Sequence, residues 1–113
     1  KMQIRPVSGA LGRVMQWELV TYLQRAHPDG RRSLGMIAQQ LQRVSPHLVQ
    51  EAAEPDRRRP REAGPLLTIS YTEASMEVAA ALQEHVQESR DELAAVRAEL
   101  AELREMVTAL RAT

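Results

Sequence analysis

The chain of 113 residues contains no cysteine, which excludes a disulfide framework and a metal site built on thiolates. It also has no Phe, one Trp and two Tyr, so a hydrophobic core must be small and aliphatic. No apolar run reaches the roughly 18 residues that span a bilayer. No signal-peptide pattern opens the chain. We therefore expect a cytoplasmic protein that has no membrane partner.

Motifs of catalysis and of cofactor binding are missing as well. The three histidines, His27, His47 and His85, lack metal-ligand spacing. The chain has no Gly-rich phosphate loop and no nucleophile elbow. We therefore expect that the protein is not an enzyme and binds no cofactor or metal.

The charged residues divide the chain into two unlike halves. Residues 1–61 carry eleven basic and five acidic side chains, a net charge of +6. Residues 62–113 carry four basic and ten acidic side chains, a net charge of −6. A polyanion would therefore bind to the amino-terminal half.

The segment 72–113 has the composition and spacing of a coiled-coil helix. It contains neither Gly nor Pro and is rich in Ala, Glu, Leu and Arg, and Thr72 is the expected N-cap. Its apolar residues alternate in steps of three and four, which is the heptad spacing. The expected dimerisation seam consists of Leu82, Val86, Leu93, Val96, Leu100, Leu103, Val107 and Leu110. Ala79 and Ser89 continue it as weaker members.

Charged residues flank this seam and favour one orientation. With Leu93 and Leu100 at heptad position a, the g positions hold Glu92 and Glu99. The e positions hold Arg90, Arg97, Arg104 and Arg111. A parallel pair sets each g Glu against an e Arg of the other helix, whereas an antiparallel pair sets like charges together. We expect a parallel homodimer; the alternative is a helix that folds back on its own domain.

Residues 1–53 are expected to contain three helices. The apolar spacing from Leu11 to Ala26 predicts the first, with Ser8 as its cap and Trp17 as a core residue beside its stripe. The second is expected from Ser33 to Leu41. The third opens at Ser45-Pro46, an N-cap followed by Pro at the first helical position, and runs to Ala53.

Two strands and a loop complete the amino-terminal region. Residues 66–71 (LLTISY) predict a strand, and residues 2–7 predict a poorer edge strand because of Pro6. Residues 54–65 contain three Pro and four Arg, which is typical of a loop.

The segment 33–53 reads SLGMIAQQLQRVSPHLVQEAA. It has a capping Ser33, Ile37-Ala38 in mid-helix, Leu41 ahead of the turn and a Val44-Ser45-Pro46 entry into the next helix. With these features it resembles helix-turn-helix DNA-binding proteins and, with the loop and strand that follow, their winged-helix form. The resemblance implies that the third helix enters the major groove of double-stranded DNA.

The same resemblance implies roles for ten residues. Ser45, His47 and Gln50 would reach base edges, and Arg31, Arg32 and Arg43 would hold phosphates. A wing with Arg57, Arg58, Arg59 and Arg61 would contact the DNA backbone. Three simpler interpretations stay open: the wing arginines could belong to a solvated linker, His47 could be an ordinary exposed residue, and Arg31 and Arg32 could serve solubility alone.

The expected fold is mainly α with a minor β component. A small, winged helix-turn-helix domain at residues 1–71 precedes a parallel coiled-coil oligomerisation helix at residues 72–113. The expected function is that of a dimeric DNA-binding protein, either a transcriptional regulator or a plasmid or chromosome partition factor associated with the nucleoid. The alternative is a non-enzymatic protein-interaction or scaffold component that its coiled coil oligomerises.

Overall fold

The computed structural model describes residues 1–52 and 64–113, and its longest element is the carboxyl-terminal helix α3 (Tyr71–Ala112). This helix has 42 residues and accounts for most of the long axis of a molecule that measures 84 × 43 × 23 Å. Ser70 is its N-cap, since the Ser70 hydroxyl accepts a hydrogen bond from the Glu73 N–H at 3.4 Å. The predicted long helix is therefore confirmed, but its cap lies two residues before Thr72.

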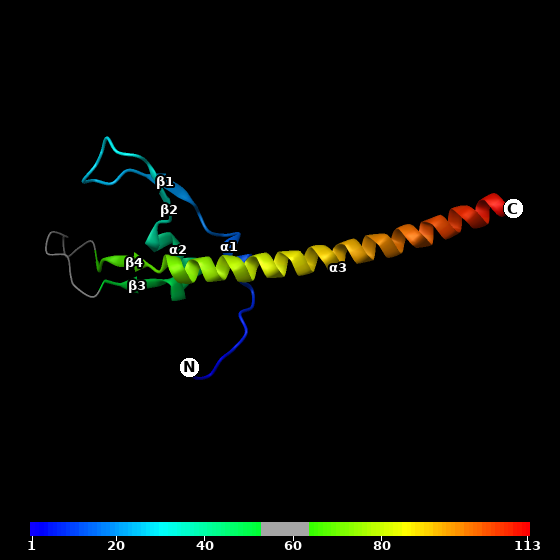
Figure 1. The fold of residues 1–113 in the computed structure, drawn as a ribbon, viewed down its shortest axis with the longest axis horizontal. Coiled ribbons are helices and arrows are strands. Elements are labelled where there is room, and N and C mark those ends of the chain that lie inside the picture. Colours follow the sequence, from blue (N-terminus) through cyan, green and yellow to red (C-terminus); the bar gives the residue numbers. More distant parts are fainter. Residues whose placement is uncertain (53–63) are drawn as a thin grey trace.

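Shorter elements gather at the amino end of α3 and form what we call the head (Figure 1). In chain order they are α1 (Ala10–Val14), β1 (Val20–Tyr22), β2 (Ser33–Gly35), α2 (Ala38–Val44), the 3-10 turn η1 (Pro46–Leu48), β3 (Val49–Glu51) and β4 (Leu67–Ile69). Strands β1 and β2 pair antiparallel with Val20 opposite Gly35, and β3 pairs antiparallel with β4 with Val49 opposite Ile69. The fold is mainly helical with a minor β component.

The core of the head is small and aliphatic. Leu41, Leu48, Val49 and Ala74 are buried together, and Trp17, Met36, Ala38, Leu67 and Ile69 pack against them. The Trp17 indole N–H donates to the hydroxyl of the fully buried Ser45 at 3.0 Å, which satisfies both polar groups. Trp17 is therefore a core residue, as its place beside an apolar stripe predicted.

The predicted first helix is much shorter than expected. Helix α1 ends at Val14, and residues 20–22 form strand β1. The run Val20-Thr21-Tyr22 is β-branched and aromatic, so it suits a strand when a partner strand is present. The prediction from Leu11 to Ala26 was wrong because spacing alone does not reveal that partner, Ser33–Gly35.

The second and third predicted helices also differ from the structure. Residues 33–35 form strand β2, and the helix begins only at Ala38. The Ser45-Pro46 entry opens a single 3-10 turn, after which the chain becomes strand β3. Val49–Glu51 pairs with Leu67–Ile69, and the long-range ladder replaces the helix that the local pattern favoured. The strand predicted at 66–71 is confirmed as β4.

Three further expectations concern residues 2–7, the loop at 54–65 and the direction of α3. Residues 2–7 form no strand. The wing predicted at 54–65 falls mostly on residues 53–63, which lie outside the described residues. Helix α3 does not fold back along its length: its first turns contact the head, and the remainder extends away from it (Figure 1).

Leu48 is 1% exposed and lies at the centre of the head core, so Leu48→Ala should lower the free energy of unfolding by about 2–5 kcal/mol. Leu19→Ala is the matched control, because Leu19 is 65% exposed and should change stability by less than about 0.5 kcal/mol. Urea unfolding at one fixed protein concentration, followed by fluorescence of the single Trp, measures both. Equal effects of the two changes would contradict the assignment of the core.

Candidate functional site

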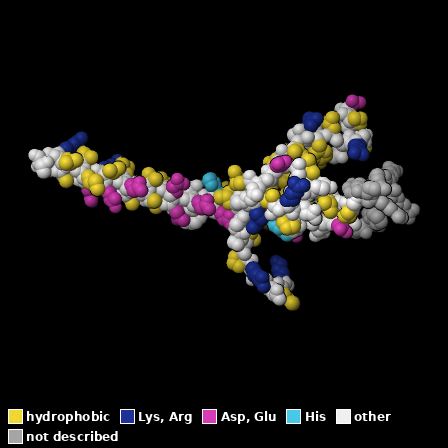
Figure 2. Space-filling view, turned by 180° about the vertical axis from the view of Figure 1, so that it is seen from behind, with side chains coloured by type: hydrophobic (Ala, Val, Ile, Leu, Met, Phe, Trp, Pro, Cys, Tyr) yellow, Lys and Arg dark blue, Asp and Glu magenta, His cyan; other side chains and the backbone are white. Residues whose placement is uncertain are grey.

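The most extensive feature of the surface is an apolar seam along α3. Its eight members were predicted from the heptad spacing, and all are exposed in the single chain, by 38% to 75%. They are Leu82, Val86, Leu93, Val96, Leu100, Leu103, Val107 and Leu110. Figure 2 shows hydrophobic side chains along the helix with acidic side chains beside them. A row of apolar side chains this long is typical of a surface that another protein covers.

A different face of α3 docks the head. Ala74, Glu77 and Ala81 are the buried residues of this helix; Ala74 packs in the core cluster of the head, and both α1 and η1 contact α3. With about 100° of rotation per residue, this docking face lies roughly 140° around the helix from the seam. The head therefore leaves the seam open, and a helix can pack on the seam without displacing the head.

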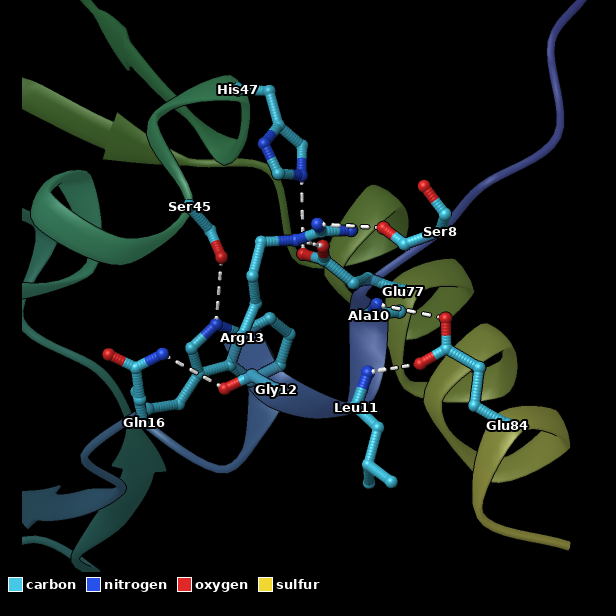
Figure 3. Close-up of polar contacts among 11 residues, drawn as sticks. Ser8, Ala10, Leu11, Gly12, Arg13, Gln16, Ser45, His47, Glu77 and Glu84 are labelled. Carbon is cyan, nitrogen blue, oxygen red and sulfur yellow. Dashed lines mark hydrogen bonds and ion pairs between the residues drawn. The ribbon is translucent and has the colours of Figure 1, made fainter. Parts of the chain in front are cut away.

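The buried carboxylate of Glu77 lies at the centre of the docking face (Figure 3). One of its oxygens accepts a hydrogen bond from the Arg13 Nε of α1, and the other lies 3.2 Å from the His47 Nε2 of η1. Arg13 also donates through Nη1 to the Ser8 carbonyl at 2.9 Å. A carboxylate that is 95% buried needs such partners, because an unpaired buried charge is costly. Glu77 thus joins three separate segments.

Glu84, two turns further along α3, caps the amino end of α1. Its two carboxylate oxygens accept hydrogen bonds from the backbone N–H groups of Ala10 at 3.1 Å and of Leu11 at 2.6 Å. These N–H groups have no partner within their own helix, and Gly9 has no side chain to cap them. The hydrogen bond from Leu11 is the largest of the effects that lower the pKa of Glu84 below its ordinary value.

The residues to which DNA contacts were assigned do not form one surface on a helix. Ser45 is fully buried beneath Trp17, and His47 is paired with Glu77. Gln50 lies in strand β3 and Arg43 in the last turn of α2. The DNA contacts assigned to these side chains depended on a recognition helix, which the structure replaces by η1 and β3.

The remaining predicted DNA contacts are arginines outside the core. Arg32 donates two hydrogen bonds across the β1–β2 hairpin. Its Nε donates to the Thr21 hydroxyl and its Nη2 to the Thr21 carbonyl, each at 3.0 Å. Arg31 is exposed beside it. Arg57, Arg58, Arg59 and Arg61 lie outside the described residues.

Glu77, Glu84 and Arg13 were missed by reasoning from the sequence. A signal was available, because Ala74, Glu77, Ala81 and Glu84 form a second stripe on α3 with helical spacing. In this stripe the Ala residues let another segment approach the helix closely, and the Glu residues supply hydrogen-bond acceptors.

Within residues 1–52 and 64–113, no three His, Asp or Glu side chains lie close enough to hold a metal ion. In the same part of the chain, no helix combines the length and the apolar character needed to cross a membrane.

One family of known proteins matches part of the chain. The family Peptidase_S74, described as chaperone of endosialidase, matches residues 1–50. The match covers the head from its amino end into β3 and stops before α3. No curated protein matches the chain.

This match corrects the resemblance inferred from residues 33–53. The family matched over that segment is a chaperone and not a DNA-binding winged-helix family. The assignment to helix-turn-helix proteins was wrong, and with it the expected roles in transcription regulation and DNA partition. The first half of the supposed motif lies in α2, but its Ser-Pro entry opens a single 3-10 turn and the residues that follow form strand β3.

Acid should weaken the docking of α1 through Glu84. Because the pKa of Glu84 is lowered in the folded chain, its contribution to stability is complete above about pH 4.5 and is lost as the pH falls through the lower folded pKa. Glu84→Gln should therefore lower the melting temperature at pH 7, and the difference between the two proteins should shrink as the pH falls below about 4.5. Glu88→Gln, on an exposed part of the same helix, is the control and should follow the unchanged protein at every pH.

Proposed function

We propose that this chain is a non-enzymatic protein-interaction module that assembles with copies of itself through a parallel coiled coil of α3. The observation that carries the proposal is the seam, since eight Leu and Val side chains at heptad spacing are exposed and unpaired in the single chain. Complete burial of a Leu or Val side chain contributes about 1.5–3 kcal/mol. Several heptads of such burial exceed the cost of ordering the two helices.

The charges beside the seam favour the parallel orientation. In a parallel pair Glu92 faces Arg97 and Glu99 faces Arg104 of the other copy. Each exposed pair contributes only a few tenths of a kcal/mol. The apolar seam therefore supplies the driving force, and the charges select among the ways in which it can be buried.

The head supports a chaperone-like role within this assembly. The family that matches residues 1–50 is described as a chaperone of endosialidase. The head is bound to the opposite face of α3 by Glu77 and Glu84, so assembly through the seam leaves it in place. Several heads would be presented together at one end of the coiled coil, and an increased effective concentration would strengthen their contacts with another protein.

Cysteine at position 100 tests the assembly and its orientation together. The chain has no native cysteine, and a parallel pair places both copies of residue 100 at the same depth of the seam. Leu100→Cys should form a disulfide-linked dimer under mild oxidation, and light scattering should give an assembled mass under reducing conditions. Ala101→Cys is the control, because position 101 faces away from the seam. A monomeric mass, or equal crosslinking at both positions, would contradict the proposal.

Charge reversal provides a second test of orientation. Arg97→Glu with Arg104→Glu converts the Glu92–Arg97 and Glu99–Arg104 pairs of a parallel dimer from attraction to repulsion, which should cost roughly 1–2 kcal/mol and weaken assembly about five- to thirtyfold. In an antiparallel pair the same change replaces Arg–Arg contacts by Glu–Glu contacts. Sedimentation equilibrium at low and at high salt measures the dissociation constant and distinguishes the parallel from the antiparallel arrangement. A dissociation constant unchanged at low salt would rule out the parallel arrangement.

A further inference from the structure

The heptad register continues from the seam into the first turns of α3, where its character changes. His85 occupies a g position, and the g positions one and two heptads before it are held by Val78 and Tyr71. The e positions of the same stretch are Met76 and Gln83. Further along α3 the g and e positions hold mainly Glu and Arg, whereas beside the head three of the four are apolar or aromatic.

These flanking side chains are exposed although they lie next to the head. Tyr71 is 49% exposed, Met76 is 66% exposed and Val78 is 46% exposed. The head packs mainly on another face of α3 and reaches Tyr71 at its hydroxyl, so it leaves these three side chains partly open. Large apolar side chains in positions that flank a coiled-coil seam become buried when the paired helix brings apolar partners.

The rule that pairs the charges also pairs these residues. In a parallel pair each g residue faces the residue five positions later in the other copy, which matches Glu92 with Arg97 and Glu99 with Arg104. Applied two heptads before His85, it matches Tyr71 with Met76 of a second copy. The two side chains are chemically complementary, because a thioether packs favourably against an aromatic ring.

The ring of Tyr71 is held in position to receive such a contact. Its hydroxyl accepts a hydrogen bond from the Met36 N–H at 3.3 Å. Gly35 allows the ring to approach, since a Cβ at this position would come within 2.9 Å of the Tyr71 hydroxyl. Tyr71 also borders an open groove of about 350 Å³ whose walls include Ile37 and Leu66, which are 42% and 37% exposed.

We propose that the self-association interface extends beyond the coiled coil into the head, where Met76 of a second copy packs against Tyr71 beside the groove of Ile37 and Leu66. The proposal rests on the parallel self-assembly proposed above. Assembly would then join the heads as well as the helices, so that their relative positions are set. The occupant is a second copy because the register that pairs Glu92 with Arg97 also places Met76 of the other helix opposite Tyr71.

Two measurements test the extension. Met76→Asp places a charge against the aromatic ring and should raise the dissociation constant of the assembly at least tenfold in sedimentation experiments. Met15→Asp is the matched control, since Met15 is 75% exposed and lies off α3, and it should change the constant less than twofold. Circular dichroism and Trp17 fluorescence should show that both variants keep the fold of the head.

A mixed crosslink gives the second readout without altering Tyr71. Val78 and Gln83 face each other across a parallel pair by the same rule, and both are exposed. An oxidised mixture of Val78→Cys and Gln83→Cys chains should give the mixed disulfide in at least fivefold excess over a mixture of Val78→Cys and Gln87→Cys.

The outcomes separate this proposal from the one on which it rests. If Leu100→Cys crosslinks but the mixed disulfide is absent, or Met76→Asp behaves like Met15→Asp, the helices pair and the heads do not join. If Leu100→Cys fails to crosslink and the chain is monomeric, both proposals fall.

Discussion

The carboxylate of Glu77 is the contact through which the separate segments of the head meet α3. It is buried, yet it is paired with Arg13 from α1 and lies beside His47 from η1. Arg13 is 30% exposed and Glu77 4% exposed, so removing Arg13 would leave a buried carboxylate without its cationic partner, which is destabilising. The hydrophobic core of the head is small, with six buried apolar residues in the described chain. A paired charge therefore has a large share in holding the head to its helix.

Two faces of one helix keep two tasks apart. Ala74, Glu77, Ala81 and Glu84 hold the head on one side of α3, and the seam lies on the opposite side. A partner helix that covers the seam need not compete with α1 for the same surface. This separation is why a chain with a docked head can still offer several heptads for assembly, and why the heads would be carried on the outside of a coiled coil.

The long helix α3 and the apolar row on it could be predicted from the sequence, whereas most elements of the head could not. The heptad spacing from Leu82 to Leu110 is a local pattern, and its many strong helix formers together with the absence of Gly and Pro favour a helix. In the head, short amphipathic stretches such as Val20–Tyr22 and Val49–Glu51 match helical spacing equally well. Their strand partners lie at Ser33–Gly35 and Leu67–Ile69, and the local sequence pattern does not indicate this pairing. The apparent helix-turn-helix motif arose from this ambiguity.

The sequence by itself determined a long helix with a continuous apolar stripe, flanked by ordered charges and preceded by a basic half. Helix propensity and periodicity depend on residues that are close together in the sequence, so both can be recognised without the tertiary structure. Only the tertiary structure decided that Ser45 lies beneath Trp17, that Glu77 is buried between Arg13 and His47, and that Glu84 caps α1. These contacts join residues 28 to 74 positions apart, and their stability comes from burial that exists only once the head has closed on α3.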